Sequence, residues 1–205
     1  MPDHRDKYYY LAKKERYRSR AAFKLLELQT KFGFLEEGHK VLEIGSSPGG
    51  WTQIINSITK SLVVSVDTQK MDPVENNIFI RGRVGDKSLK LRIKDEMERH
   101  GFSEFNGIMS DAMSRTSGNQ DIDHSSSYLI CMEVMELAKT LLAHNGFVLV
   151  KQFQGDLTTQ FVNEWKRFFR FSKVTKVAAS REASKEIYII FQGFMPHGAE
   201  SSQSS

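Results

Sequence analysis

The sequence predicts a single α/β domain with a doubly wound, mostly parallel sheet of seven strands, of which one is antiparallel. Apolar segments of strand length alternate along the chain with amphipathic segments of helix length, a pattern typical of parallel sheets covered by helices on both faces. The last two strand-like segments follow one another directly, which predicts a closing hairpin and the antiparallel strand. No internal repeat or linker divides the 205 residues, and their 40% hydrophobic content suits one domain with a buried core.

Seven strands are predicted from short runs of aliphatic and β-branched residues. They cover residues 40–44, 62–66, 77–80, 105–109, 146–151, 173–178 and 186–192. Five helices are predicted from apolar residues at helical spacing, and they cover residues 19–31, 50–57, 86–100, 128–143 and 157–169. Ser19 is expected to cap the first helix, Gly33 to end it, and a polar loop to cover residues 113–126.

Positive charge is concentrated near the N-terminus. Residues 1–31 contain nine Lys or Arg and four Asp or Glu, a net of +5, whereas the remaining 174 residues contain twenty and twenty-one, a net of −1. Four of the six tyrosines lie in the same segment: Tyr8, Tyr9, Tyr10 and Tyr17. Because cations neutralise phosphates and flat rings stack on unpaired bases, we interpret the segment as a nucleic-acid contact surface. A solvated basic arm without a ligand is the alternative.

Composition also bounds the domain and excludes several classes of protein. We expect a basic, tyrosine-rich arm over residues 1–18, a folded domain over residues 19–195 and a disordered polar tail over residues 196–205. No apolar run approaches the ~18 residues of a membrane-spanning helix. With no secretory signal and Cys131 as the single cysteine, a reducing, cytoplasmic location is expected, without a disulfide or a metal site. A monomer is expected because the composition indicates no large exposed apolar stripe.

A glycine-rich loop over residues 45–50 joins the first predicted strand to the following helix. In open α/β sheets, ligands bind beyond the carboxyl ends of the strands, where small residues let the backbone approach them. The G-x-x-x-G-G spacing matches neither the dinucleotide motif G-x-G-x-x-G nor a phosphate-binding P-loop. The loop therefore predicts a nucleotide-type ligand, with a tight turn that binds nothing as the alternative.

Asp67 ends the second predicted strand, 22 positions after Gly45. A carboxylate at this place can accept hydrogen bonds from both hydroxyls of a ribose, which indicates an adenosine-type ligand. NAD and S-adenosylmethionine both satisfy the pattern, and an exposed carboxylate in a turn is a third interpretation. A NAD-dependent oxidoreductase is disfavoured, because the sequence lacks the dinucleotide motif and an identifiable set of hydride-transfer residues.

Several motifs together resemble those of the FtsJ/RrmJ family of S-adenosylmethionine-dependent RNA 2′-O-methyltransferases. They occur in the family's order between residues 8 and 194, and cover residues 17–25, 45–53, 66–67, 71–73, 110–111, 150–155 and 184–188. The resemblance implies a Rossmann-like fold of seven strands, S-adenosyl-L-methionine as cofactor and RNA as substrate. Within the family the chain is most similar to enzymes that methylate a uridine ribose of large-subunit ribosomal RNA, with the assembled subunit as the expected partner. Transfer RNA as substrate, or a catalytically silent module that binds S-adenosylmethionine and RNA, are the alternatives.

The resemblance assigns the family's catalytic tetrad to Lys24, Asp111, Lys151 and Glu186. Taken singly, each could be a solvated surface residue, but Asp111 and Lys151 end successive predicted strands at the edge where ligands bind. A ribose 2′-hydroxyl is weakly acidic, so a lysine that deprotonates it needs a lowered pKa. A second ammonium and burial lower the pKa of a lysine, whereas carboxylates raise it. Lys151 is therefore assigned as base or steering group and Lys24 as its tuning partner. Asp111 is expected to orient Lys151, and Glu186 to hold the network.

The same resemblance assigns cofactor contacts to Gly49, Trp51, Asp67 and Asp111. One position departs from the family pattern. Where the family has Gly-Asp for the adenine amino group, this chain has Gly82-Arg83, and an arginine cannot accept a hydrogen bond from an amine. Arg83 stays a candidate cofactor residue, and backbone groups, Asp86 or a weaker cofactor site are three explanations of the change.

Overall fold

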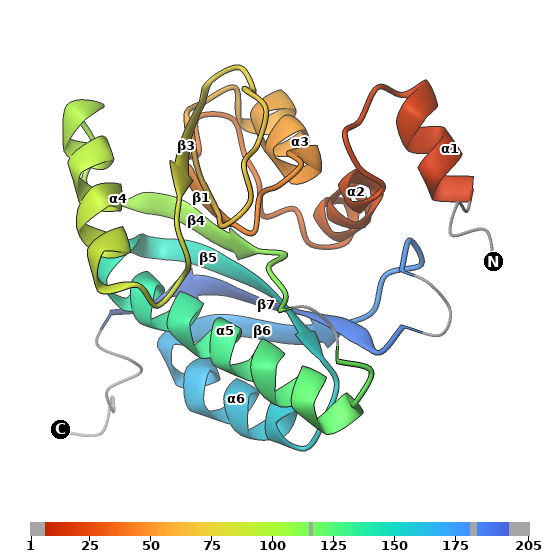
Figure 1. Cartoon of the computed structure of the whole chain (residues 1–205). Coiled ribbons are helices and arrows are strands. Elements are labelled where there is room, and N and C mark those ends of the chain that lie inside the picture. The colour runs from red at the N-terminus through yellow and green to blue at the C-terminus, as the bar shows by residue number, and fades with distance from the viewer. Residues whose placement is uncertain (1–6, 115–116, 181–183, 197–205) are drawn as a thin grey trace, which may run out of the picture.

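The computed structural model describes residues 7–114, 117–180 and 184–196, and the structural statements below concern these residues. They form a seven-stranded sheet in the order β3-β2-β1-β4-β5-β7-β6 (Figure 1). The strands are β1 Val41–Ile44, β2 Val63–Asp67, β3 Asn77–Arg81, β4 Phe105–Ser110, β5 Leu142–Phe153, β6 Phe169–Thr175 and β7 Glu186–Phe194. Strand β7 runs antiparallel to β5 and β6, and the other neighbouring strands are parallel. The doubly wound sheet with one antiparallel strand is thereby confirmed.

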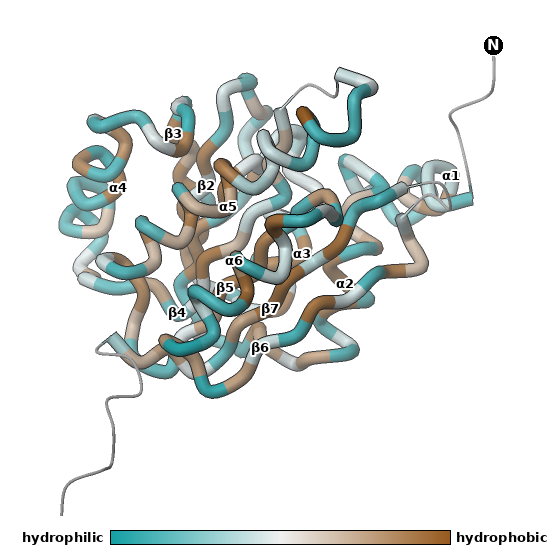
Figure 2. The backbone as a smooth tube through the Cα atoms, turned by 90° about the horizontal axis from the view of Figure 1, so that it is seen from below, coloured by the Kyte–Doolittle hydropathy of each residue, from teal (hydrophilic) through white to brown (hydrophobic). Residues whose placement is uncertain are grey.

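Helices cover both faces of the sheet (Figure 1). They are α1 Lys7–Lys14, α2 Ala21–Phe32, α3 Gly50–Thr59, α4 Lys87–Arg99, α5 Gln120–Leu141 and α6 Leu157–Trp165, followed by the short 3-10 helix η1 Lys166–Phe168. Successive residues of a strand point to opposite faces. Leu149 of β5 accordingly joins the core under α2 and α3, whereas Val148 and Val150 join the core under α4, α5 and α6. Figure 2 shows the central strands as hydrophobic segments between helices with hydrophilic outer residues.

The order of the strands reverses beside β1. The chain continues from β1 through β2 to β3 at one edge, and then returns to place β4 on the other side of β1. Ligands bind at such a switch point, beyond the carboxyl ends of the strands. The loops that follow β1 and β4 meet there, since a Cβ on Gly45 would lie 2.5 Å from the main-chain nitrogen of Ala112.

The expected arm over residues 1–18 contains a helix that the sequence did not indicate. Helix α1 buries Ala12, and the ring of Tyr8 lies 5.7 Å from that of Phe23 on α2. The described part of the arm is therefore folded against the domain. At the other end, residue 196 is described, and the remainder of the expected tail lies outside the described residues.

Helix α2 ends as predicted but begins differently. Gly33 follows its last residue with a φ of +59°, a left-handed conformation that glycine adopts readily. The expectation that Ser19 caps the helix is wrong, because Arg20 occupies the N-cap position and makes no capping hydrogen bond with its side chain. Ser19 instead packs on α3, where its hydroxyl would lie 2.2 Å from a Cβ on Gly50.

Helix α5 begins at Gln120, so the predicted loop over residues 113–126 is too long and the predicted start at residue 128 is wrong. The side chain of Asn119 accepts hydrogen bonds from the main-chain nitrogens of Asp121 at 3.0 Å and Ile122 at 3.4 Å. An asparagine cap followed by acidic residues in the first turn stabilises a helix start. The first two turns are mostly polar, which is why apolar spacing alone places the start too late.

The boundaries of the last helix and the following strands also move. Strand β5 begins at Leu142, before the predicted start at residue 146, and α6 ends at Trp165, before the predicted end at residue 169. Phe169 begins β6 and packs its ring 5.1 Å from Phe191 and 5.2 Å from Phe194. These contacts with β7 determine where β6 begins, and they cannot be predicted from the sequence around Phe169 alone.

Candidate active site

Lys151, near the end of β5, is buried against Asp111, which follows β4. Its ammonium lies 2.9 Å from Oδ1 of Asp111 and donates a 2.7 Å hydrogen bond to the main-chain carbonyl of the same residue. The side chain of Lys151 is 6% exposed. Since an ammonium has three N–H donors, these two contacts leave one donor for a further group. The structure thus brings two of the predicted site residues together at the switch point.

Lys24 and Glu186 form the second pair. Nζ of Lys24, on α2, lies 2.6 Å from Oε2 of Glu186, the first residue of β7. The side chains are 10% and 15% exposed, and the hydroxyl of Ser180 donates a 3.2 Å hydrogen bond to the same carboxylate oxygen. Lys24 therefore lies at the interface of its helix with the sheet, and the reading of this lysine as a solvated surface residue is wrong.

The two pairs form one electrostatic cluster. Burial opposes ionisation of Glu186, but the ammonium groups of Lys24 and Lys151 outweigh it and hold the pKa of this carboxyl below its ordinary value. Tyr188 joins the pairs: its hydroxyl donates a 3.1 Å hydrogen bond to Oδ1 of Asp111, and its ring centre lies 6.0 Å from Nζ of Lys24. Burial, together with both carboxylates, raises the pKa of Tyr188 well above its ordinary value. The phenol therefore remains a hydrogen-bond donor at neutral pH.

The loop between β1 and α3 has a backbone that favours glycine. Gly45 and Gly49 have φ angles of +80° and +106°, which residues with a Cβ rarely adopt. The hydroxyl of Ser46, between them, is buried and has no hydrogen-bond partner within the described residues. Buried polar groups in folded proteins are normally hydrogen-bonded, so this hydroxyl is a candidate partner for a ligand at the loop.

Asp67, the last residue of β2, faces the same loop. Its Oδ2 accepts a 2.9 Å hydrogen bond from the main-chain nitrogen of Ser47, and its Oδ1 accepts a 2.7 Å hydrogen bond from that of Gln69. An ionised carboxylate offers about four acceptor positions. The two main-chain contacts therefore fix the orientation of Asp67 and leave capacity on each oxygen for a further hydroxyl.

Glu43, in the middle of β1, is a site residue that the sequence prediction missed. Its side chain accepts a 2.6 Å hydrogen bond from the hydroxyl of Thr52, and the residue is 1% exposed. Burial, with the carboxylates of Asp111 and Asp67, raises the pKa of Glu43 to about 8 despite that hydrogen bond. The protonated form adds no third negative charge beneath the loop. The signal that could have found it is a single acidic residue inside an apolar strand.

Arg18 is a second residue that the sequence prediction missed. Its guanidinium donates hydrogen bonds to the main-chain carbonyls of Asp72 and Pro73, each at 2.6 Å, and of Pro48 at 3.4 Å. It also covers Gly49, where a Cβ would lie 3.1 Å from Nη1. Arg18 thus ties together the loops that follow β1 and β2, and joins both to the segment between α1 and α2.

Trp51, a predicted cofactor residue, is buried in the core under the cluster. It is 2% exposed, its indole nitrogen donates a 2.8 Å hydrogen bond to the carbonyl of Ala21, and its ring lies 6.1 Å from that of Tyr188. The indole therefore supports the start of α2 and the ring of Tyr188. Only the main chain of Trp51, in the first turn of α3, can face a ligand at the loop.

Arg83, the position that departs from the family pattern, lies among carboxylates. Its main-chain nitrogen donates a 3.2 Å hydrogen bond to Oδ2 of Asp86. Glu133 of α5 reaches the same turn, since a Cβ on Gly85 would lie 2.3 Å from its Oε1. Burial raises the pKa of Glu133, against the opposing effect of the Arg83 guanidinium. Two carboxylates, those of Asp86 and Glu133, therefore lie near Arg83. The sequence prediction missed Glu133 because it lies far along the chain.

Residues 7–114, 117–180 and 184–196 contain neither a candidate metal centre nor a candidate membrane-spanning helix. No group of three or more His, Cys, Asp or Glu side chains there could hold a metal ion. None of the helices in these ranges is long and apolar enough to span a membrane.

Comparisons with known proteins identify the family. The model of FtsJ-like methyltransferases matches residues 17–194. Ribosomal RNA large subunit methyltransferase E of Picrophilus torridus is 48% identical over 91% of this chain and 96% of its own, and its namesake from Thermoplasma acidophilum is 45% identical over 94% and 93%. A solved structure described as a ribosomal RNA methyltransferase from Plasmodium falciparum has a TM-score of 0.79 at 29% identity, and covers 87% of this chain and 99% of its own. This chain belongs to the FtsJ-like methyltransferase family.

Proposed function

We propose that this protein transfers a methyl group from S-adenosyl-L-methionine to a ribose 2′-hydroxyl of RNA, and that the target is a uridine of large-subunit ribosomal RNA. The observation that carries the proposal is the buried cluster of two lysines and two carboxylates beside the glycine loop. Relatives at 45–48% identity, named for the large ribosomal subunit, support the substrate.

The residues at the switch point fit S-adenosylmethionine. Asp67 has acceptor capacity for two ribose hydroxyls, and the buried hydroxyl of Ser46 has no partner among the described residues. The main chain at Gly49 carries no Cβ that would obstruct a ligand. For the adenine amino group we assign the carboxylate of Asp86, which lies beside Arg83 and can accept the hydrogen bond that an arginine cannot. When bound, this cofactor supplies a methyl group activated on a sulfonium.

Lys151 is assigned to the attacking hydroxyl. Two of its N–H donors are held by Asp111, and the third is free to hold the 2′-oxygen in line with the methyl group. The same ammonium stabilises the negative charge that develops on this oxygen as the hydroxyl proton leaves and the new O–CH₃ bond forms. Because Asp111 already fixes the ammonium of Lys151, little reorganisation of the site is required at the moment of reaction.

The contacts of Lys151 also bear on the choice between base and steering group. As the cationic partner of Asp111, 2.9 Å away, Lys151 offers the hydroxyl an N–H donor and no lone pair. This contact supports the steering role, with the proton passing to water.

The N-terminal helix α1 is assigned to the RNA strand. Lys13 and Lys14 are exposed in its last turn, and Tyr10 is 54% exposed. Exposed cations and aromatic rings on one helix suit phosphates and unstacked bases. Arg18, in the segment between α1 and α2, contacts the glycine loop. An RNA strand on α1 would therefore lie beside the proposed cofactor site.

Methyl transfer to defined RNA preparations tests this proposal. Radiolabelled S-adenosylmethionine is offered with undermethylated large ribosomal subunits, naked ribosomal RNA and bulk transfer RNA, and the labelled linkage is located by its resistance to alkaline hydrolysis. We expect label at a single ribose 2′-oxygen of the large subunit. Label on transfer RNA alone would overturn the substrate and keep the reaction. Cofactor binding without label on any RNA would overturn the reaction and favour a catalytically silent module.

A further inference from the structure

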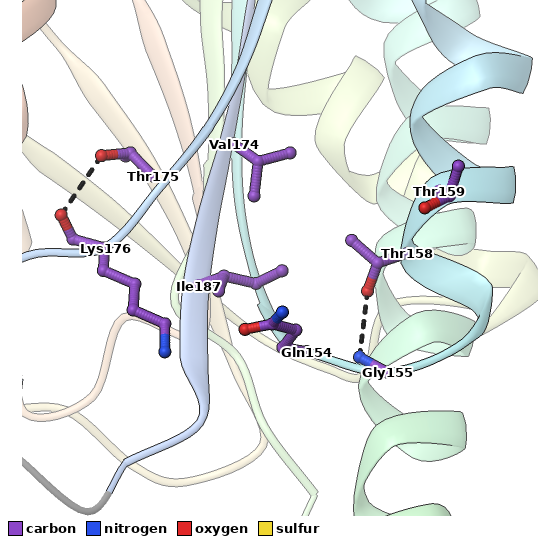
Figure 3. Close-up of a pocket in the computed structure, with 8 residues that line it drawn as sticks. All are labelled: Gln154, Gly155, Thr158, Thr159, Val174, Thr175, Lys176 and Ile187. Carbon is purple, nitrogen blue, oxygen red and sulfur yellow. Dashed lines mark hydrogen bonds between the residues drawn. The ribbon is translucent and has the colours of Figure 1, made fainter.

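A cavity of about 260 Å³ lies between the first turn of α6 and the strands β6 and β7, at the edge of the sheet where β5 ends. Figure 3 shows Val174 and Ile187 extending from the strands toward α6, with Thr158 and Thr159 on the facing helix and Gln154 between them. Lys176 lies beside the cavity, just after β6. None of these residues belongs to the four-residue cluster described above.

The cavity and the cluster lie on opposite faces of the same strand end. Ile187 directly follows Glu186, and successive strand residues point to opposite faces of the sheet. Glu186 turns toward Lys24 of α2, whereas Ile187 joins the core that contains Phe161 of α6. On the neighbouring strand, Gln154 is three positions after Lys151. A strand of RNA that crosses this edge of the sheet can therefore contact the cluster and the cavity together.

The floor of the cavity is apolar. Val174 of β6 is 38% exposed, and Ile187 lines the same cavity from β7, diagonally across from it, since the residue opposite Val174 is Ile189. Ile187 is only 2% exposed, so Val174 provides most of the accessible apolar surface of the floor. Such a surface suits one face of a planar ring.

The rim of the cavity carries polar groups that are not otherwise used. The amide of Gln154, the hydroxyl of Thr159 and the ammonium of Lys176 take part in no hydrogen bond within the described part of the chain, and all three residues are exposed to solvent. By contrast, Thr158 accepts a hydrogen bond from the main chain of Gly155 and donates one to Gln152. An apolar floor with free amide, hydroxyl and ammonium groups at its rim matches a nucleobase and the phosphate of the same nucleotide.

We propose that this cavity binds a nucleobase of the RNA strand that flanks the methylated nucleotide. The inference rests on the proposed function, because it takes RNA as the substrate of the cluster. The volume of the cavity is below the roughly 300–1,000 Å³ of sites for drug-sized ligands, and it suits a single base. The base lies on Val174, with the buried Ile187 beneath it, its polar edge meets Gln154 and Thr159, and Lys176 contacts the adjoining phosphate. Single-stranded RNA is commonly recognised through bases held out of the stack in this manner.

Two pairs of matched variants test the site by steady-state kinetics on undermethylated large subunits. Thr159→Trp fills the cavity from the exposed surface of α6, and Gln160→Trp places the same side chain on the next exposed position. Lys176→Glu reverses the charge beside the cavity, and Lys173→Glu makes the same change at an exposed position on β6, outside the cavity. We expect Thr159→Trp and Lys176→Glu to raise KM for the subunit at least fivefold, with kcat at saturating subunit and cofactor affinity unchanged. Equal KM values for each variant and its control would overturn the proposal.

Photo-crosslinking tests the site without relying on methyl transfer. The wild-type protein is irradiated with a transcript of large-subunit RNA that contains 4-thiouridine, and crosslinked peptides are mapped by mass spectrometry. We expect crosslinks in residues 154–159 or 174–176, and their loss in Thr159→Trp. Crosslinks found only elsewhere would overturn the base site. A rise in KM for Lys176→Glu without one for Thr159→Trp would also overturn it, because it would indicate a phosphate contact without a bound base. If wild type transfers no methyl to any RNA, the proposed function fails, and crosslinks in the cavity still decide whether it binds RNA.

Discussion

Tyr188 donates its hydroxyl hydrogen bond to Oδ1 of Asp111, the same oxygen that lies 2.9 Å from Nζ of Lys151. One carboxylate oxygen thus receives both a phenol and an ammonium in a buried site. The phenol fixes the carboxylate, and the carboxylate fixes the lysine. In the proposed mechanism Tyr188 contacts neither the ribose hydroxyl nor the cofactor. It can nevertheless control the direction in which Lys151 points, because it acts through Asp111.

Tyr188→Phe removes this hydrogen bond and keeps the packed ring. Hydrogen bonds to charged groups contribute about 1.5–3 kcal/mol, and part of that is used to hold Asp111 in place. We expect the single-turnover rate of methyl transfer to fall about tenfold, with little change in cofactor affinity, measured with labelled cofactor on undermethylated large subunits. A rate equal to that of wild type would show that Asp111 is held without the phenol.

Glu43→Gln should change how stability depends on pH. In the unfolded chain Glu43 loses its proton near pH 4.5, whereas in the folded protein its pKa is about 8. Between these values the unfolded state binds fewer protons, so the stability that this group contributes is complete below pH 4.5 and is lost as pH rises toward 8. The free energy of unfolding of wild type relative to Glu43→Gln should fall by up to about 1.4 kcal/mol per pH unit in this window.

Urea unfolding of both proteins at pH 5, 6, 7 and 8 measures this difference. The glutamine keeps an acceptor for the hydroxyl of Thr52, so it serves as a nearly isosteric reference that does not titrate. A constant difference across the pH range would mean that Glu43 is ionised in the folded protein throughout.

Arg18→Lys should weaken cofactor binding. A lysine ammonium cannot reproduce the planar set of donors with which the guanidinium reaches Asp72, Pro73 and Pro48. With the two loops less well fixed, we expect the dissociation constant for S-adenosylmethionine, measured by calorimetry, to rise threefold to tenfold, and kcat at saturating cofactor to change little. A loss of kcat with unchanged affinity would place Arg18 in the methyl-transfer step instead.

Lys13→Glu should weaken binding of RNA and leave cofactor affinity unchanged. Each phosphate contact that is lost lowers the slope of log affinity against log salt by about one. The matched control is Lys94→Glu on α4, which makes the same charge change at an exposed position outside the N-terminal segment. Filter binding of ribosomal RNA at several salt concentrations compares the two. Equal losses for both variants would indicate a general charge effect and no contact at α1.

The strands of the sheet, and the convergence of the residues at their ends, could be predicted from the sequence because both depend on local patterns. Buried strands are apolar runs, and β1, β2 and β4 end next to Gly45, Asp67 and Asp111. The carboxyl ends of parallel strands meet at one edge, so these positions converge in any sheet with this strand order. The same reasoning failed for Lys24, whose helical position alone suggested solvent.

Contacts between residues that lie far apart in the sequence could not be predicted from local patterns. Arg18 binds main-chain carbonyls, which any sequence provides, so no motif marks its partners. The start of α5 depends on the cap at Asn119, and the start of β6 on aromatic contacts of Phe169 with β7. Local propensity is a weak guide where capping and tertiary packing decide the boundary.

Lys151→Met tests the central claim, that Lys151 directs the ribose hydroxyl in methyl transfer. The variant removes the ammonium and keeps the length of an apolar stem, and Lys94→Met at the exposed position on α4 is its control. The measurement is the single-turnover rate of labelled methyl transfer to undermethylated large subunits, with cofactor affinity determined in parallel. We predict a fall of about 10²-fold or more for Lys151→Met, with cofactor affinity within threefold of wild type. A rate within twofold of wild type would contradict the assignment of Lys151 and, with it, the proposed mechanism.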